Sequence, residues 1–190
     1  MSSNFSPQLL WANRQRTVKI DVKKIRQLVE AALPCCSKEP RHATSLLPRL
    51  IEVTFLSDRA ITKVHADFLD DPTPTDVITF RHSETLGEIL VGVPTAAAHA
   101  KKFHQPVDHE MALCVIHGLL HLLDYDDMTP AECDIMHRRQ DEILKKVVAE
   151  KFSQKMYPFT SPEKTEIPPF AESLVLQKDN ALQRKNALFV

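Results

Sequence analysis

Residues 117–127 read HGLLHLLDYDD, and this stretch decides which fold and which chemistry the chain can support. Its two histidines, His117 and His121, are four residues apart in a segment whose apolar residues recur at helical spacing. With about 3.6 residues per turn, side chains four apart lie one above the other on a helix and can bind one metal ion. We therefore expect a helix over residues 107–123 that supplies two ligands of a metal site.

A carboxylate is well placed to complete that site. Asp127 follows His121 by six residues, after a turn that brings the chain back toward the helix. Two imidazoles, one carboxylate and an open position for water form the ligand set of a catalytic zinc site. The pattern therefore predicts a metal-dependent hydrolase with His117, His121 and Asp127 as ligands.

Other side chains compete for the third ligand position. Asp124 and Asp126 belong to the same acidic turn, and Asp124 is better suited to a left-handed backbone position, which aspartate tolerates. His137 is a further alternative if the next predicted helix folds back over the site. Two residues lie too far along the helix, about 10 Å or more, to share one ion with both histidines: Cys114 and His109.

The residue between the histidines separates this pattern from that of a protease. In the H-E-x-x-H motif of metalloproteases, the glutamate after the first histidine is the general base. Gly118 takes that place here, so peptide hydrolysis by that mechanism is disfavoured and a base must come from elsewhere. A glycine inside a helix costs about 1 kcal/mol relative to alanine, which indicates that this position needs space.

The composition limits the remaining classes of function. The 190 residues are 43% hydrophobic, carry a net charge of −1 and include only three glycines, which cannot form a phosphate-binding loop. RNA binding would need a local basic patch, because the overall charge provides no attraction. The four cysteines do not form a disulfide framework, and no secretory leader or long apolar run is visible. We expect a cytoplasmic protein without membrane contact.

Hydrophobic periodicity and capping residues predict the secondary structure. Strands are expected at residues 17–20, 49–57, 77–80 and 86–93. Helices are expected at residues 21–33, 58–68, 94–103, 107–123 and 130–151. Their predicted caps and breakers are Asp21, Pro34, Ser57 or Asp58, Pro94 and Thr129.

The chain is expected to divide into one domain and a tail. Residues 1–152 form the predicted metal-hydrolase domain. Beyond Phe152, prolines crowd a polar segment, so residues 153–190 are expected to be a flexible tail with at most one marginal helix over residues 171–190.

These residues resemble the YbeY family, metal-dependent endoribonucleases of rRNA maturation. HGLLHLLDYDD is close to the family signature HGxLHLxGYDH, and PTDVITF (74–80) is similar to PTDVLSF. Three further segments resemble the family in the same order, within residues 13–150: IEVTFLSD (51–58), LGEILV (86–91) and MHRRQDEIL (136–144).

The resemblance implies an α+β fold, in which helices flank a small mixed four-stranded sheet and a zincin-like metal helix packs on it. It implies zinc bound by His117, His121 and Asp127. It also implies single-strand-specific cleavage of RNA in small-subunit rRNA maturation and ribosome quality control, with rRNA and the small ribosomal subunit as partners.

Two segments depart from the family pattern. The third ligand is usually histidine in the family and is Asp127 here, a harder ligand that makes Mn²⁺ or Mg²⁺ an alternative to Zn²⁺. In the loop before PTDV, the family usually has an arginine followed by Gly-Lys-Asp, whereas this chain has Leu69, Asp70 and Asp71. That acidic loop favours a second interpretation, a non-catalytic ribosome-assembly factor with a structural metal. A metallopeptidase is a third and weaker one.

Several further residues have predicted roles near the metal. Asp126 and Glu88 are candidates for the catalytic base or for orienting the site. Arg81, with His82 as an alternative, is a candidate for the missing cation that contacts RNA phosphate. Thr75 is a candidate for lining the substrate cleft, with a purely structural role as an equal alternative.

Overall fold

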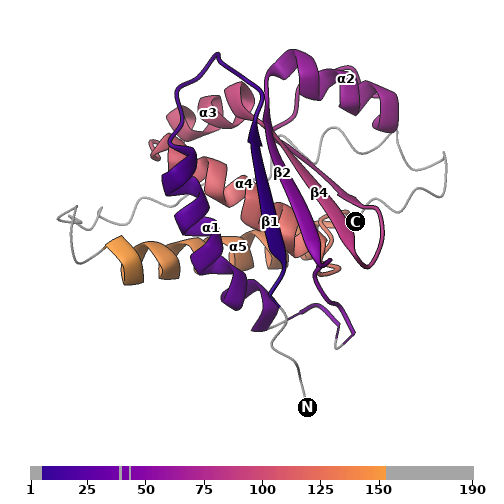
Figure 1. Cartoon of the computed structure of the whole chain (residues 1–190), viewed down its shortest axis with the longest axis vertical. Coiled ribbons are helices and arrows are strands. Elements are labelled where there is room, and N and C mark those ends of the chain that lie inside the picture. The colour runs from indigo at the N-terminus through magenta and orange to yellow at the C-terminus, as the bar shows by residue number, and fades with distance from the viewer. Residues whose placement is uncertain (1–5, 39, 43, 153–190) are drawn as a thin grey trace.

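The computed structural model describes residues 6–38, 40–42 and 44–152, which form a sheet with helices on both faces (Figure 1). The predicted tail, residues 153–190, lies outside the described residues together with its marginal helix. Among the described helices, none is long and apolar enough to cross a membrane. The elements in chain order are β1 (Gln8–Asn13), α1 (Val22–Lys38), β2 (Leu50–Leu56), α2 (Asp58–Leu69), β3 (Val77–Arg81), β4 (Leu86–Gly92), α3 (Val93–Lys102), α4 (Val107–His121) and α5 (Pro130–Phe152).

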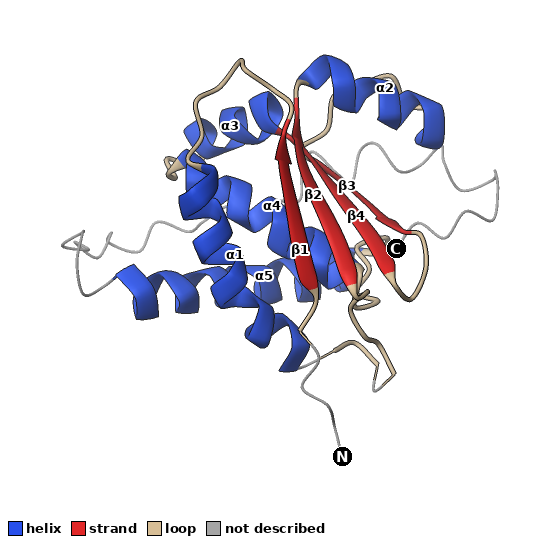
Figure 2. Cartoon of the chain, viewed as in Figure 1, coloured by secondary structure: helices blue, strands red, loops and turns tan. Residues whose placement is uncertain are grey.

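The sheet has four strands in the order β1-β2-β4-β3 (Figure 2). β1, β2 and β4 run parallel, and β3 pairs antiparallel with β4 at one edge. The predicted small mixed four-stranded sheet is therefore confirmed.

The two faces of the sheet bury cores of different size. Alternate residues of β2, Ile51, Val53 and Phe55, are fully buried in the larger core, which α1, α4 and α5 complete. On the opposite face, α2 contributes Ile61 to a small cluster with Leu56 of β2 and two residues of β3 and β4. This division follows from the alternation of side chains along a strand.

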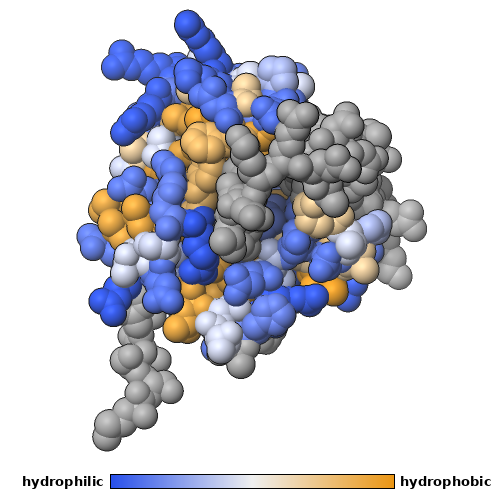
Figure 3. All heavy atoms as spheres, turned by 90° about the vertical axis from the view of Figure 1, so that its right-hand side faces the viewer, coloured by the Kyte–Doolittle hydropathy of each residue, from blue (hydrophilic) through white to orange (hydrophobic). Residues whose placement is uncertain are grey.

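The surface is mixed in character. On the face that lies to the right in Figure 1, hydrophobic residues form several separate groups among hydrophilic ones (Figure 3). The exposed large hydrophobic residues of the described chain come from different elements: Leu10, Leu46, Phe68, Met128 and Ile135.

Several predicted helix starts are confirmed by their capping bonds. The side chain of Asp21 accepts a hydrogen bond from the Lys24 backbone N–H (3.0 Å), and Ser57 caps α2. Thr129 accepts from the Glu132 N–H (3.2 Å) at the start of α5. These oxygens satisfy backbone donors that a helix leaves without partners in its first turn.

The first predicted strand was wrong. Residues 17–20 form no strand, because the Gln15 side chain accepts from the backbone N–H groups of Thr17 and Val18 and folds this segment into a turn. The strand that pairs with β2 is instead Gln8–Asn13. It lies at the sheet edge and is mostly half-buried or exposed, so its hydrophobic alternation is weak.

The predicted end of the first helix was also wrong. Pro34 does not end α1, which continues to Lys38. Pro34 itself is exposed, whereas Cys36 beyond it is fully buried in the larger core. Packing of the last turn against the core offsets the loss of the backbone hydrogen bond that a proline cannot donate.

Helix α4 is enclosed by other elements along most of its length. It packs against α1, α3 and α5 as well as β3 and β4, and every residue from Glu110 to Leu120 is buried. The metal helix is therefore packed on the sheet, as predicted, and also lies inside the domain.

Gly118 allows α4 to approach the sheet closely. A Cβ atom at this position would lie 2.8 Å from Thr79 Oγ1 and 2.9 Å from Ile89 Cγ2. The sequence indicated that this position requires a small residue. The reason is that the sheet occupies the volume in which a larger side chain would lie.

We predict that Gly118→Ala destabilises the domain despite the better helix propensity of alanine. Overpacking costs about 1–3 kcal/mol, and the propensity gain offsets about 1 kcal/mol of it. Urea unfolding of the metal-free protein measures the net loss. The loss should shrink in a Thr79→Ala background, which removes the nearest atom; an unchanged loss there would contradict this explanation.

Candidate metal centre

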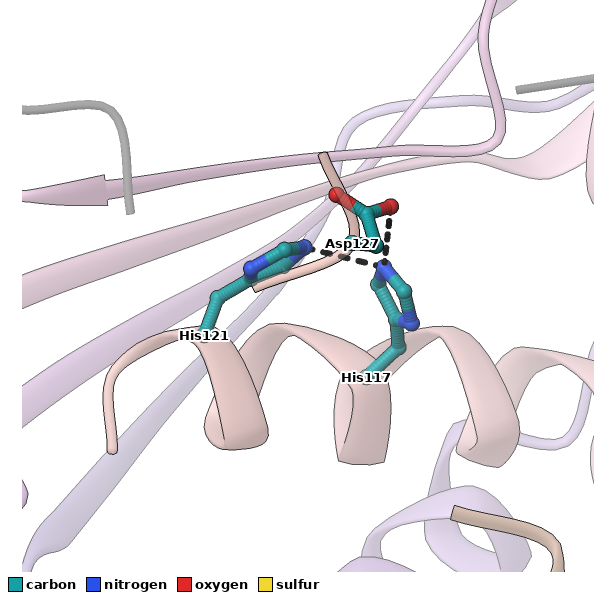
Figure 4. Close-up of side chains that lie close together, drawn as sticks. All are labelled: His117, His121 and Asp127. Atoms are coloured by element: carbon teal, nitrogen blue, oxygen red, sulfur yellow. Dashed lines mark hydrogen bonds and ion pairs between the residues drawn. The ribbon is translucent and has the colours of Figure 1, made fainter. Parts of the chain in front are cut away.

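Helix α4 and the turn after it bring three potential ligands together (Figure 4). One ligand atom from each of His117, His121 and Asp127 lies within 4.8 Å of the others. His117 and Asp127 are buried and His121 is half-buried. The three residues predicted from spacing therefore converge on one point.

The two histidines are held so that their Nε2 atoms face each other. His117 Nδ1 lies 2.8 Å from Gln140 Oε1, and His121 Nδ1 lies 3.1 Å from the Tyr125 carbonyl oxygen. Each Nδ1 faces an oxygen acceptor, so Nδ1 is the nitrogen that carries the proton in a neutral ring, and Nε2 of that ring then offers its lone pair to a metal.

The distances fit a cation between these groups. The two Nε2 atoms are 3.0 Å apart, and Asp127 Oδ2 lies 3.9 Å from His117 Nε2. Two lone pairs and a carboxylate repel one another at such distances unless a positive charge lies among them. Two imidazoles with one carboxylate is a ligand set of catalytic zinc, so the residues present fit a metal ion.

The turn after α4 uses a left-handed residue. Asp124 has φ 64°, as predicted for this position. Its N–H donates to the His121 carbonyl oxygen, and the Tyr125 N–H donates to the Leu120 carbonyl oxygen. These two bonds form a Schellman motif, which satisfies carbonyls at a helix end and reverses the chain toward the histidines.

The competing carboxylates of the turn are engaged elsewhere. Asp124 Oδ2 accepts a 2.5 Å hydrogen bond from Ser45 Oγ. Asp126 is exposed, and its Oδ1 accepts from the backbone N–H groups of Asp127 (2.7 Å) and Met128 (3.2 Å). Asp126 therefore stabilises the backbone at Asp127, and the structure brings only Asp127 of these three into the ligand group.

His137 lies beside the site and outside the ligand group. Its ring centroid is 6.2 Å from that of His117, and its nitrogens are 3.6 and 3.8 Å from Cys133 Sγ. Burial, followed by the neighbouring His117, lowers its pKa. The alternative of His137 as third ligand is not the arrangement seen here.

Glu88 does not join the metal ligands. It precedes Ile89 on β4, and Ile89 faces Gly118 of the metal helix. Because neighbouring side chains on a strand point to opposite faces, Glu88 faces away from α4, where its Oε2 lies 3.2 Å from His82 Nε2.

The two residues predicted to bind substrate make contacts within the domain. Thr75 is buried, and its hydroxyl donates to Asp76 Oδ1 (3.3 Å). Arg81 Nη2 donates to the Leu46 carbonyl oxygen (2.9 Å) and to the Leu122 carbonyl oxygen.

Gln140 is a site residue that the sequence analysis missed. It is 1% exposed and holds the tautomer of His117. A signal existed in the sequence, since Gln140 is the polar member of a helical series whose other members form the core: Met136, Ile143 and Val147.

A second buried polar cluster was also missed. Asp76, His99 of α3 and Glu110 of α4 interact electrostatically, and Asp76 Oδ2 lies 3.4 Å from His99 Nδ1. Glu110 is 1% exposed, and burial, together with the nearby Asp76, raises its pKa to about 7. The neighbouring Asp76 carboxylate raises the pKa of His99.

Comparison with known proteins gives one consistent family. Residues 10–148 match the family described as Endoribonuclease YbeY. The endoribonuclease YbeY of Syntrophus aciditrophicus is 32% identical over 146 residues, 70% of this chain and 84% of that protein. The Chlamydia trachomatis protein of the same name is 31% identical over 150 residues, 73% of this chain and 87% of that one.

A solved structure supports the fold. The solution structure of TM1509 from Thermotoga maritima superposes with a TM-score of 0.54, covering 80% of this chain and 99% of that one at 23% identity. The four-stranded sheet and its helices are therefore an architecture already seen in a solved protein.

We predict that Glu110→Gln removes part of the pH dependence of stability. The folded pKa of about 7 exceeds the ordinary value of 4.5, so the wild type loses stability as pH rises between these values. The slope is at most about 1.4 kcal/mol per pH unit. Urea unfolding of metal-free protein between about pH 5 and pH 8 should show a flatter curve for Glu110→Gln, and parallel curves would contradict the assignment.

We predict that Gln140→Leu weakens metal binding. His117 Nδ1 would lose its acceptor, and loss of such a partner typically costs about 10–100-fold in metal affinity. Zn²⁺ competition against a chromophoric chelator measures the change. Ile143→Val on the same helix is the control, with a stability loss of about 1 kcal/mol and an unchanged affinity. An equal affinity loss in both variants would mean that Gln140 acts only through stability.

Proposed function

This chain belongs to the YbeY family of endoribonucleases, and we propose that it hydrolyses phosphodiester bonds of single-stranded RNA with a metal-bound water. The observation that carries the proposal is the convergence of His117, His121 and Asp127 within 4.8 Å. The family match over residues 10–148 includes all three of these residues.

Each side chain has a defined part in this function. When bound, a metal ion would supply Lewis-acid activation of water and stabilisation of charge on the phosphoryl oxygens. His117 and His121 would hold it through Nε2, in the orientation fixed by Gln140 and the Tyr125 carbonyl. Asp126 keeps the backbone at Asp127 in place.

We propose Zn²⁺ as the metal, because two imidazoles and one carboxylate suit it. The carboxylate of Asp127 makes the site harder and more negative than three imidazoles would, so Mn²⁺ or Mg²⁺ is the alternative. The added negative charge would also make a metal-bound water less acidic than in a site of three imidazoles.

We propose small-subunit rRNA maturation and ribosome quality control as the biological setting. Its partners would be rRNA and the small ribosomal subunit, in the cytoplasm. The resemblance of the motifs HGLLHLLDYDD and PTDVITF to those of the family supports this setting.

A non-catalytic ribosome-assembly factor with a structural metal is the second candidate. The loop after α2 favours it, because Leu69, Asp70 and Asp71 stand where the family usually has an arginine followed by Gly-Lys-Asp. The Asp71 carboxylate accepts from the backbone and the side chain of Thr73, so it belongs to the loop's own hydrogen bonding. Arg81, the predicted replacement cation, donates to two backbone carbonyls.

A metallopeptidase is disfavoured by the packing at Gly118. A glutamate at this position, as in the protease motif, would direct its Cβ against Thr79 and Ile89. The close approach of α4 to the sheet therefore excludes that general base.

We predict that His121→Ala and Asp127→Ala lose both bound metal and RNA cleavage. Each loss should exceed about 100-fold, since partners that only orient a ligand are worth up to that much. Elemental analysis gives the metal content, and a fluorescent single-stranded RNA, compared with its duplex, gives the activity. Asp127→His should retain metal because it replaces the carboxylate with an imidazole.

Asp67→Ala is the matched control, since Asp67 pairs with Lys63 on α2, which packs on the opposite face of the sheet. It should keep both metal and cleavage. Wild type that holds metal without metal-dependent RNA cleavage would support the assembly factor instead. Wild type that binds no metal would refute the metal centre itself.

A further inference from the structure

The turn from Leu122 to Asp127 controls two of the three metal ligands. It supplies the carboxylate of Asp127 directly. It also supplies the Tyr125 carbonyl oxygen that accepts from His121 Nδ1 and so directs Nε2 at the site. A displacement of this turn would move Asp127 and reorient His121 together, while His117 would keep its partner on α5.

Two side chains from other parts of the sequence form hydrogen bonds with this turn. Arg81, the last residue of β3, donates from Nη2 to the Leu122 carbonyl oxygen, which lies directly after α4. Ser45 donates to the carboxylate of Asp124, which holds the left-handed position of the turn. Both contacts join residues far apart in sequence.

Arg81 also links its own contact with the turn to the segment that contains Ser45. The same Nη2 atom donates to the Leu46 carbonyl oxygen at 2.9 Å, and Leu46 follows Ser45. The guanidinium thus holds the end of α4 and the segment at Ser45 in one arrangement. β3 is an edge strand of the sheet (Figure 2), and Arg81 lies on the same face of this strand as Thr79, which faces Gly118.

The chemistry of the contact suits an arginine. A helix leaves its last carbonyls without partners, and these carry partial negative charge. The Leu122 carbonyl lies beyond the two carbonyls, of Leu120 and His121, that the Schellman bonds use. A planar guanidinium keeps its charge at any physiological pH and presents several donors in fixed directions, so it can serve two carbonyls at once.

We propose that Arg81 is a positioning residue of the metal centre, which fixes the turn from Leu122 to Asp127 by joining the carbonyls of Leu122 and Leu46. The inference rests on the proposed metal site. It gives Arg81 a role in metal binding that differs from contact with RNA phosphate.

The test is the Zn²⁺ affinity of Arg81→Met, measured by chelator competition on the full chain. The expected loss is about 10–100-fold, the usual range for residues that orient ligands. Arg81→Lys should fall between wild type and Arg81→Met, because one ammonium on a flexible chain does not reproduce the guanidinium geometry. The visible absorption of the Co²⁺-loaded proteins should change in Arg81→Met, since it reports the arrangement of the ligands.

Asp108→Ala is the matched control at the other end of the same helix. Asp108 ties the start of α4 to α1 by accepting from the Asp21 N–H (3.1 Å) and pairing with Lys24 (3.3 Å). It should lower the thermal stability of the metal-free protein and leave Zn²⁺ affinity within about threefold of wild type, because the metal-binding turn keeps its contacts.

The outcomes separate the inference from the function on which it rests. If wild type binds Zn²⁺ and Arg81→Met binds it equally well, the positioning role is refuted and the metal site stands. An equal affinity loss in Asp108→Ala would also refute it, since general destabilisation would then explain both. If wild type binds no Zn²⁺, the proposed function fails first. Should Arg81→Met not fold, Arg81→Lys and Ser45→Ala provide the same comparison, and unchanged affinity in both overturns the proposal.

Discussion

Burial of α4 on all sides is the constraint on which the rest of this structure depends. A buried polar group without a partner costs about 1–3 kcal/mol, so each polar side chain on this helix needs compensation inside the domain. His117 obtains it from Gln140 of α5, and His121 from a carbonyl of the turn. Both compensating oxygens bind the Nδ1 side of the ring. As a result, the packing that buries the helix also directs two nitrogen lone pairs to one point.

The same packing explains why this site differs from that of a protease with a similar histidine spacing. α4 lies so close to the sheet at Gly118 that Thr79 and Ile89 occupy the space of a side chain. The short distance between helix and sheet therefore leaves no room for the glutamate that serves as general base in the protease motif. The site keeps two ligands on the helix without a neighbouring base. Its third ligand comes from the turn, and the partner of His117 comes from α5.

The acidic turn contains three carboxylates with three different tasks. Asp124 occupies a left-handed position and bonds to Ser45, Asp126 caps its own backbone, and Asp127 faces the histidines. Residue type alone does not separate them, because each can ligate a metal. Their positions in the turn separate them. Asp124 takes the left-handed position of the Schellman motif, and the Asp126 side chain bonds the backbone that follows it, whereas Asp127 lies with the histidines.

The sequence by itself determined the metal helix, its two histidines, three of the four strands and most helix starts, because these depend on local periodicity, capping and spacing. The mixed four-stranded sheet was implied by the family resemblance. It also determined Asp127 as the preferred ligand and Asp124 as the left-handed residue, both from short-range geometry. Only the tertiary structure decided the edge strand Gln8–Asn13 and the passage of α1 through Pro34. Gln140, the Asp76–His99–Glu110 cluster and the bonds of Arg81 were likewise decided there, because each joins residues distant in sequence.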